Sequence, residues 1–361
     1  MFCKTYKLVL LLKEKIKQNR RDEGWMVNFK NKRELLKLTG DISQLFGIKK
    51  YVMKGGMKEG TRVLEVNNGS GLVFSILPDR GLDISYLSYR GINMSYISKT
   101  GIVGPQFFQS RSLGFHRSFF GGFLTTCGLR NVGTPVLDDG EEFELHGRIS
   151  HIPAEEVYSY AEWTEKGPVI KIGGKMREAR LFGEHLTLKR EICVEPGCNV
   201  ININDVIENE GFEEEIIMLL YHFNLGYPFV DKSSYFICPT KKVEPRDEDA
   251  AAGKETYDKC HEPVHSYKEQ VFYHEPIADE CGNTYAGFVN PELNIKAIIN
   301  FNKNQLCNLT QWKQMGEGEY VIGIEPCNCR VEGRVKQKER GDAEILRPGE
   351  KKTVNLKVEI S

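Results

Sequence analysis

From about residue 60 to the C-terminus, apolar and polar positions form short runs separated by turns. The runs are rich in Val, Ile, Tyr and Phe, as in residues 61–91, 168–178, 186–211 and 293–304, and Gly, Asn, Asp and Pro lie between them. This pattern predicts β-strands joined by turns. Because no long helical segment interrupts it, the sequence predicts one large antiparallel β-sandwich of many strands.

One predicted strand, within residues 214–231, combines two apolar faces with a histidine. Ile216, Met218, Leu220, His222 and Asn224 share one face by the two-residue period, and the alternate residues 217–225 form the other. Both faces are apolar up to His222, so we expect a strand inside a sheet that is packed on both sides. His222 is either a hydrogen-bonded core residue or the lining of a pocket at the strand end.

The first 59 residues differ in character and are predicted to be a partly helical N-terminal extension of the β-domain, which spans residues 60–361. Within residues 31–46, Leu35, Leu38, Ile42 and Leu45 form a helical stripe that Gly40 weakens. Residues 1–25 carry too short an apolar run for a signal peptide. We interpret them as a short amphipathic helix or an upstream extension, dispensable in either case.

Composition narrows the function classes. The 361 residues carry a net charge of −1, and no apolar run approaches the roughly 20 residues that span a bilayer. Neither nucleic acid nor a membrane is therefore expected as a partner. The ten cysteines do not have zinc-site spacing, so the chain is interpreted as cytoplasmic and reduced, with its oligomeric state left open.

Residues 241–270 form the most polar stretch of the chain. We expect a long surface excursion here, which is either a lid or a solvated loop.

Three earlier motifs contain polar or aromatic residues suited to a ligand site. Arg80 and Asp83 lie in a tight turn, PDRGLDI. They either form a local ion pair or bind a ligand. Residues 115–133 mix aromatics with glycines, which allow close backbone approach and stacking on a sugar ring, or form a core hairpin. In LHGRISHIPAE, a strand would place His146 and Arg148 on one face and His151 on the other.

The strongest candidate acid lies in QWKQMGEGEYVIGIEPCNC, residues 311–329. Glu325 follows an apolar strand and precedes Pro326, which is expected to end that strand, while Gly323 leaves room beside it. A buried carboxylate is costly unless it is hydrogen-bonded or functional. Lys313, in the same stretch, is included among the candidate binding residues, as is Asn224 beside His222.

Taken in order, PDRGLDI, GGFLTTCGL, LHGRISHIPAE, YHFNLGYP and YVIGIEP resemble the galactose mutarotase-like superfamily. Within it they are similar to an aldose 1-epimerase-like family of uncertain substrate, known as a domain of unknown function. The resemblance covers residue 60 to the C-terminus. It implies a β-supersandwich that holds a sugar in an open cleft.

The resemblance also implies roles for individual residues. His222, before FNLG, matches the general acid that protonates the sugar ring oxygen, and Glu325 matches the general base for the anomeric hydroxyl. His146, followed by Gly147, matches the assisting sugar-binding histidine, and Arg148 is similar to an arginine of sugar-6-phosphate mutarotases. The aspartate that clamps sugar hydroxyls has no clear match, and Asp279 is the nearest residue.

Three functions are consistent with these residues. The first is an isomerase that opens a sugar ring by acid and base catalysis with an ionised Glu325 and a protonated His222, without a cofactor. The second is a sugar-binding or regulatory module without turnover. The third is a metal-dependent sugar epimerase or isomerase that uses His146, His222 and Glu325 as ligands. Arg80 and Arg148 further predict an anionic or unusually polar sugar.

Overall fold

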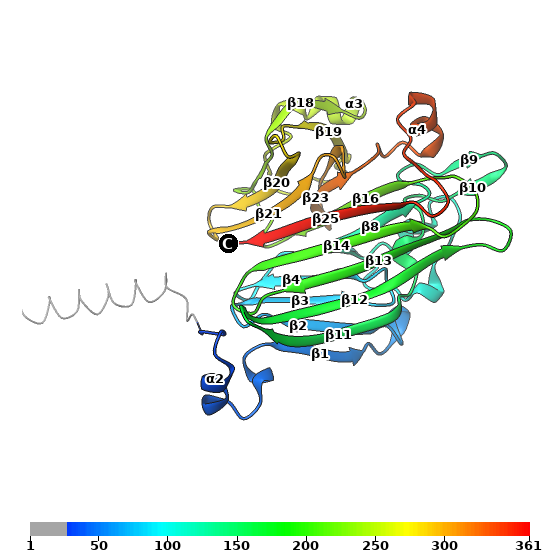
Figure 1. Cartoon of the computed structure of the whole chain (residues 1–361). Helices are drawn as coiled ribbons and strands as arrows, with labels where there is room; N and C mark the ends of the chain where they lie inside the picture. Colours follow the sequence, from blue (N-terminus) through cyan, green and yellow to red (C-terminus); the bar gives the residue numbers. More distant parts are fainter. Residues whose placement is uncertain (1–26) are drawn as a thin grey trace, which may run out of the picture.

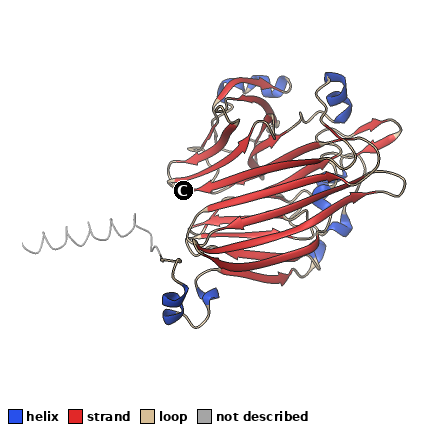
Figure 2. Ribbon diagram, viewed as in Figure 1, coloured by secondary structure: helices blue, strands red, loops and turns tan. Residues whose placement is uncertain are grey.

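The computed structural model describes residues 27–361, so the predicted helix within residues 1–25 lies outside the described part. Strands dominate the molecule, and the helices are short and peripheral (Figure 2). None of the helices in the described part is long and apolar enough to cross a bilayer. The predicted all-β supersandwich with a small N-terminal helix is confirmed.

Three large antiparallel sheets build the sandwich. The first, in the order β1-β2-β3-β4-β5, contains β1 (Gly47–Val52), β2 (Arg62–Asn67), β3 (Leu72–Leu77), β4 (Asp83–Tyr89) and β5 (Ile92–Asn93). The second, in the order β11-β12-β13-β14-β25-β21-β20-β17, contains β11 (Glu155–Thr164), β12 (Gly167–Ala179), β13 (His185–Val194), β14 (Val200–Asn209), β25 (Lys351–Ile360), β21 (Ile295–Asn302), β20 (Asn283–Asn290) and β17 (Tyr235–Ile237). The third, in the order β18-β19-β22-β23-β16-β8, contains β18 (Thr240–Pro245), β19 (Gln270–Pro276), β22 (Asn308–Gly316), β23 (Glu319–Cys327), β16 (Met218–Gly226) and β8 (Leu124–Leu129).

The remaining elements are small. The two-stranded pairs are β6 (Tyr96–Ile97) with β7 (Gly121–Gly122), β9 (Val136–Asp138) with β10 (Glu141–Phe143), and β15 (Glu215–Ile216) with β24 (Ile345–Leu346). The α-helices within residues 27–361 are α2 (Lys32–Leu38), α3 (Glu248–Ala252) and α4 (Arg334–Arg340), and the 3-10 turns there are η1 (Ile42–Gln44), η2 (Gly56–Lys58), η3 (Pro105–Phe107), η4 (Gly114–Arg117), η5 (Ile149–His151) and η6 (Lys254–Thr256). Figure 1 shows α2 below the sandwich, and α3 and α4 along its upper edge.

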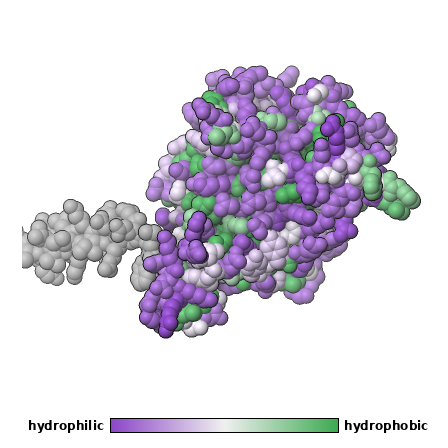
Figure 3. All heavy atoms as spheres, viewed as in Figure 1, coloured by the Kyte–Doolittle hydropathy of each residue, from purple (hydrophilic) through white to green (hydrophobic). Residues whose placement is uncertain are grey.

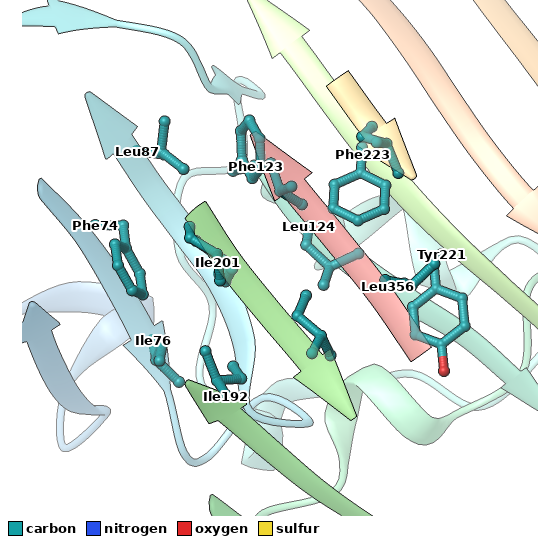
Figure 4. Packing of buried hydrophobic residues seen from close by; sticks show 14 of the residues in the cluster. Phe74, Ile76, Leu87, Phe123, Leu124, Ile192, Ile201, Tyr221, Phe223 and Leu356 are labelled. Carbon is teal, nitrogen blue, oxygen red and sulfur yellow. The ribbon is translucent and has the colours of Figure 1, made fainter. Parts of the chain in front are cut away.

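The main core lies between the eight-stranded sheet and the other two. Phe74 of β3, Ile201 of β14 and Phe223 of β16 belong to one continuous cluster of buried apolar side chains, and Leu356 of β25 joins them (Figure 4). Each strand places every second side chain in this layer, as the alternation predicts. The opposite face of the six-stranded sheet is therefore free to build a site.

The N-terminal segment is part of this packing. The predicted helical stripe forms α2 and η1, with Asn31 capping α2 by accepting a hydrogen bond from the Glu34 backbone, and the chain bends at Gly40. Phe29, Leu35 and Phe46 join the core cluster, and β1 pairs with β2 although it precedes residue 60.

The polar stretch 241–270 contains β18, α3 and η6. Residues 256–261 lie on the core-side face of the six-stranded sheet, where side chains of β22 and β23 hold them. Lys313 donates to the carbonyl of Thr256 at 2.7 Å, and Gln311 donates to that of Tyr257 at 2.8 Å. The middle of the stretch is therefore fastened to the sheet, and only its two ends reach the site.

The space-filling view shows a mainly polar surface on one face of the molecule, with apolar side chains scattered over it (Figure 3). The described cysteines form no disulfide.

Candidate active site

His222 and Glu325 are brought together by the register of two neighbouring strands. The antiparallel pairing of β16 with β23 aligns Leu220 with Cys327 and Phe223 with Ile324, which sets His222 opposite Glu325. On the other side of β23, Thr310 of β22 is paired with Glu325. Directly opposed residues have Cβ atoms about 5 Å apart, so Thr310, Glu325 and His222 form one row across three strands.

The two titratable side chains touch. Nε2 of His222 lies 3.2 Å from Oε1 of Glu325, and both side chains are almost fully buried. The geometry is not that of a good hydrogen bond, and within the described residues neither Oε1 of Glu325 nor Nδ1 of His222 has a hydrogen-bond partner. Buried polar atoms without a protein partner are rare and are a mark of ligand sites.

Both side chains line a cavity of about 590 Å³ on the face of the sheet opposite the main core. This volume is in the range of small-molecule sites. Strands of the sheet supply Thr310, Trp312 and Gln314 of β22 and Glu319 of β23. Segments outside this sheet or next to its strands supply the other walls, which include Tyr96, Lys99, Phe115, His116, Phe119, His146, Arg246 and Glu269.

Aromatic rings surround the pair. The indole of Trp312 and the ring of Phe119 lie 5.4 and 5.5 Å from the His222 ring, centroid to centroid, and the ring of His146 lies 6.0 Å away. Aromatic walls with a few polar groups are suited to a sugar, because its C–H faces stack on rings while its hydroxyls hydrogen-bond.

His146 reaches the cavity from a constrained turn. Its φ is 59°, an unusual value for a residue with a side chain, and its backbone N–H and C=O bond to Gly133 and Gly128. Gly147 follows with φ 68°, and a Cβ there would lie 2.2 Å from the carbonyl oxygen of Gly128. Such strain persists where the surroundings fix it, commonly at functional sites.

Burial favours the uncharged forms of these groups. It raises the pKa of Glu325 well above its usual value, with a further increase from Glu269, and lowers the pKa of His222 well below its usual value, with a contribution from His146. The pKa of His146 is lowered to about 4, chiefly by burial. Burial therefore favours a neutral Glu325 and a neutral His222, opposite to the expected ionised Glu325 and protonated His222, and only Arg246 acts in the other direction on Glu325.

Comparison with known proteins identifies the family. A family model described as a domain of unknown function (DUF4432) matches residues 58–360. The chain belongs to the DUF4432 family. No curated protein matches it.

Solved structures share the DUF4432 chain's fold. A "putative aldose 1-epimerase" from Klebsiella pneumoniae superimposes with a TM-score of 0.83 at 27% identity, over 88% of this chain and 86% of the other. A galactose mutarotase-like protein from Clostridium acetobutylicum gives 0.60 at 15% identity, over 88% and 99%. A galactose 1-epimerase from Lactobacillus acidophilus gives 0.56 at 13%, also over 88% and 99%. The galactose mutarotase-like fold inferred from the motifs is confirmed.

Six of the predicted substrate-binding residues of this DUF4432 chain are absent from the cavity lining. Arg80 is fully buried and donates to three backbone carbonyls, and burial lowers its pKa to about 10. Asp83 pairs not with Arg80 but with Arg190, at 2.8 Å. Both residues tie loops and strands together.

The other four are also engaged elsewhere. Arg148 pairs with Glu144 at 2.9 Å, because residues 145–148 form a turn rather than the expected strand and do not align it with His146. Asn224 is buried and donates to the carbonyls of Gly121 and His222. Exposed Asp279 accepts hydrogen bonds from the backbone of its own turn, and Lys313 points to the opposite face of β22 from Trp312.

Several lining residues were missed by the sequence analysis. Thr310, Trp312 and Gln314 alternate along β22, so the two-residue period that located Glu325 could have found them. Arg246 and Glu269 stand at the two ends of the polar stretch, where the sequence gives no such signal. Within residues 27–361, no group of three or more His, Cys, Asp or Glu side chains is placed to hold a metal ion.

Proposed function

We propose that this protein interconverts the anomers of a sugar, as an aldose 1-epimerase, with His222 and Glu325 as its acid–base pair. The observation that carries the proposal is the contact of these two side chains, 3.2 Å apart on the wall of an aromatic-lined cavity. The name of the similar protein from Klebsiella pneumoniae, a "putative aldose 1-epimerase", supports the same reaction, and the galactose 1-epimerase from Lactobacillus acidophilus has the same fold.

The reaction needs a base and an acid at neighbouring oxygens. The base takes the proton of the C1 hydroxyl, the C1–O5 bond breaks as the C1 carbonyl forms, and the ring oxygen receives a proton from the acid. Rotation about C1–C2 and reclosure on the other face of the carbonyl give the second anomer. Both oxygens are bonded to C1, so two side chains in contact can serve them together.

The pair requires one proton between its two members. Burial favours that proton on Glu325, which makes its carboxyl the acid and the neutral imidazole of His222 the base. This assignment is opposite to the one that the family resemblance implies. Ring closure returns both protons by the reverse transfers, so the pair is ready for the next turnover.

The test is the rate of anomer exchange, measured by exchange NMR on a panel of aldoses, for the wild type, Glu325→Gln and His222→Asn. Each substitution is expected to lower the catalysed rate by about 10²–10⁴-fold, since each removes one proton transfer. Sugar affinity should change much less. A wild type that binds sugars without accelerating exchange would instead identify a binding module.

A further inference from the structure

Glu269 holds two partners at the cavity with the two oxygens of one carboxylate. Its Oε1 accepts from Nη2 of Arg246 at 3.0 Å, and its Oε2 accepts from the indole Nε1 of Trp312 at 2.9 Å. All three residues line the cavity. Arg246 is held further by a 2.7 Å contact with Asp247 and by its backbone N–H, which donates to the carbonyl of Val271.

These contacts fix the ring that stands beside the acid–base pair. The indole of Trp312 is nearly perpendicular to the imidazole of His222, at 85°. Because its N–H is directed to Glu269, the plane of the indole is set by that carboxylate. A sugar that stacks on Trp312 therefore has its position relative to His222 and Glu325 decided in part by Glu269.

The same contact neutralises a cation. Arg246 pairs with Glu269. Lys99, a second cation in the cavity lining, pairs with Glu319 at 2.5 Å. An anionic sugar would have to compete with a carboxylate for either cation. The arginines from which the sequence analysis predicted an anionic sugar, Arg80 and Arg148, are engaged outside the cavity.

We propose that Glu269 is a specificity-determining residue, which masks the charge of Arg246 and orients Trp312 so that the cavity selects an uncharged sugar over its acidic counterpart. The proposal deepens the proposed function and rests on it for the orientation of the sugar. In Glu269→Gln an NH2 group replaces one of the two carboxylate oxygens, so in the wild-type geometry either Trp312 or Arg246 faces a donor instead of an acceptor. Asp247 still holds Nε of Arg246 in Glu269→Gln, but Nη2 of the guanidinium loses its carboxylate partner and becomes available to a ligand in the cavity.

The test compares matched pairs of ligands, D-galactose with D-galacturonate and D-glucose with D-glucuronate, by ligand-observed NMR titration. The wild type is expected to bind the neutral member of a pair more tightly. In Glu269→Gln the ratio of the two dissociation constants should move by about tenfold toward the uronate, since a charge-assisted hydrogen bond is worth about that much. The double variant Glu269→Gln/Arg246→Gln should return the ratio toward the wild-type value.

A second measurement follows the indole N–H signal of Trp312 by ¹H–¹⁵N NMR. Loss of its carboxylate partner should move this signal in Glu269→Gln, while Glu319→Gln, at the same rim, should leave it in place. This readout does not require a sugar.

The outcomes separate this proposal from the proposed function. An unchanged ratio in Glu269→Gln, or a shift that persists in the double variant, overturns the specificity role even if anomer exchange is confirmed. A shifted ratio in a protein without exchange activity leaves Glu269 as a specificity residue of a binding site. If the wild type binds no member of either pair, the specificity proposal fails, and the exchange rate on the panel of aldoses decides the proposed function separately.

Discussion

At the scale of single residues, the site depends on two titratable groups that are buried in contact with each other. Only the state with one proton on the pair is competent for ring opening. The pKa of His222 is lowered and that of Glu325 is raised, both chiefly by burial. The pH range in which the one-proton state predominates is therefore extended toward both acid and alkaline pH.

We therefore predict a broad plateau in the pH dependence of kcat/KM. Activity should fall on the acid side only well below pH 6.5, where His222 gains a proton, and His146, with a pKa of about 4, should steepen that limb. It should fall on the alkaline side well above pH 4.5, where Glu325 loses its proton. Rate measurements by exchange NMR from pH 4 to 10 check this, and an acid limb centred at an ordinary histidine value would contradict it.

Glu325→Gln should be more stable than the wild type although its catalysed rate is expected to be much lower. A carboxyl whose pKa is raised on folding contributes stability that is present below its unfolded pKa and is lost as the pH rises toward the folded value. Glutamine cannot ionise, so its advantage should grow by up to about 1.4 kcal/mol for each pH unit in that interval. Urea unfolding of both proteins at pH 5 and pH 8 measures the difference, and an advantage independent of pH would refute the argument.

The sequence pattern predicts the positions of some side chains of the site but not the partners of buried charged residues. The alternation in residues 214–231 and 311–329 indicated that His222 and Glu325 follow buried apolar runs. It could not indicate that Asp83 is neutralised by Arg190, which is distant in the chain. Which residue neutralises a buried charge depends on how the sheets pack against each other. The residues next to that charge in the sequence do not specify this packing.

At the scale of elements, the neighbouring strands β22, β23 and β16 together support the site. Side chains of the site crowd around Gly323 of β23, since a Cβ there would meet Oε1 of Glu325 at 2.6 Å and Cβ of Trp312 at 2.9 Å. The sequence-based expectation that this glycine leaves room beside Glu325 agrees with these distances.

Gly323→Ala is expected to lower the rate of anomer exchange by at least tenfold while leaving the protein folded. Its backbone does not have a positive φ, so the added methyl group acts by displacing Glu325, Trp312 and His222, whose Cε1 would lie 3.1 Å from it. Gly40→Ala is the matched control, because a Cβ at that position meets no atom within 4 Å. Circular dichroism should show both variants folded, and full activity in Gly323→Ala would argue against a tightly positioned pair.

Regular elements were predictable and irregular ones were not. The strand patterns gave β16 and β23, although β23 continues through Pro326 to Cys327 instead of ending before it. Residues 145–148 were expected to be a strand, and their turn is set by contacts of His146 with Gly128 and Gly133, which come from another part of the chain. Local pattern cannot reveal a turn that tertiary contacts impose.

At the scale of the whole molecule, the β-fold followed from the number and spacing of the strands, while its N-terminal limit did not. The family model begins at residue 58, yet β1 and the core residues Phe29, Leu35 and Phe46 precede it. Phe29 and Phe46 pack against each other, and Phe46 also packs against Trp163 of β11, a contact between distant segments that the local sequence pattern does not reveal.

Two truncated chains test whether the folded β-domain begins near residue 27 or at residue 58. A chain starting at residue 27 is expected to keep the wild-type stability and activity, in line with the prediction that residues 1–25 are dispensable. A chain starting at residue 58 should lose several kcal/mol, because it exposes the edge of β2 and removes three buried aromatic or aliphatic side chains. Thermal unfolding of both chains provides the measurement, and equal stability would place the boundary at residue 58.

The position of β25 has a consequence for the order of events during synthesis on the ribosome. This strand pairs with β14 on one side and β21 on the other, and every other described strand is translated before it. Until it arrives, the growing chain carries two unpaired strand edges within what becomes a single sheet, a condition that favours capture by chaperones or aggregation. A nascent chain stalled before Lys351 should therefore remain sensitive to protease, and protection should appear only when the last ten-residue strand is released.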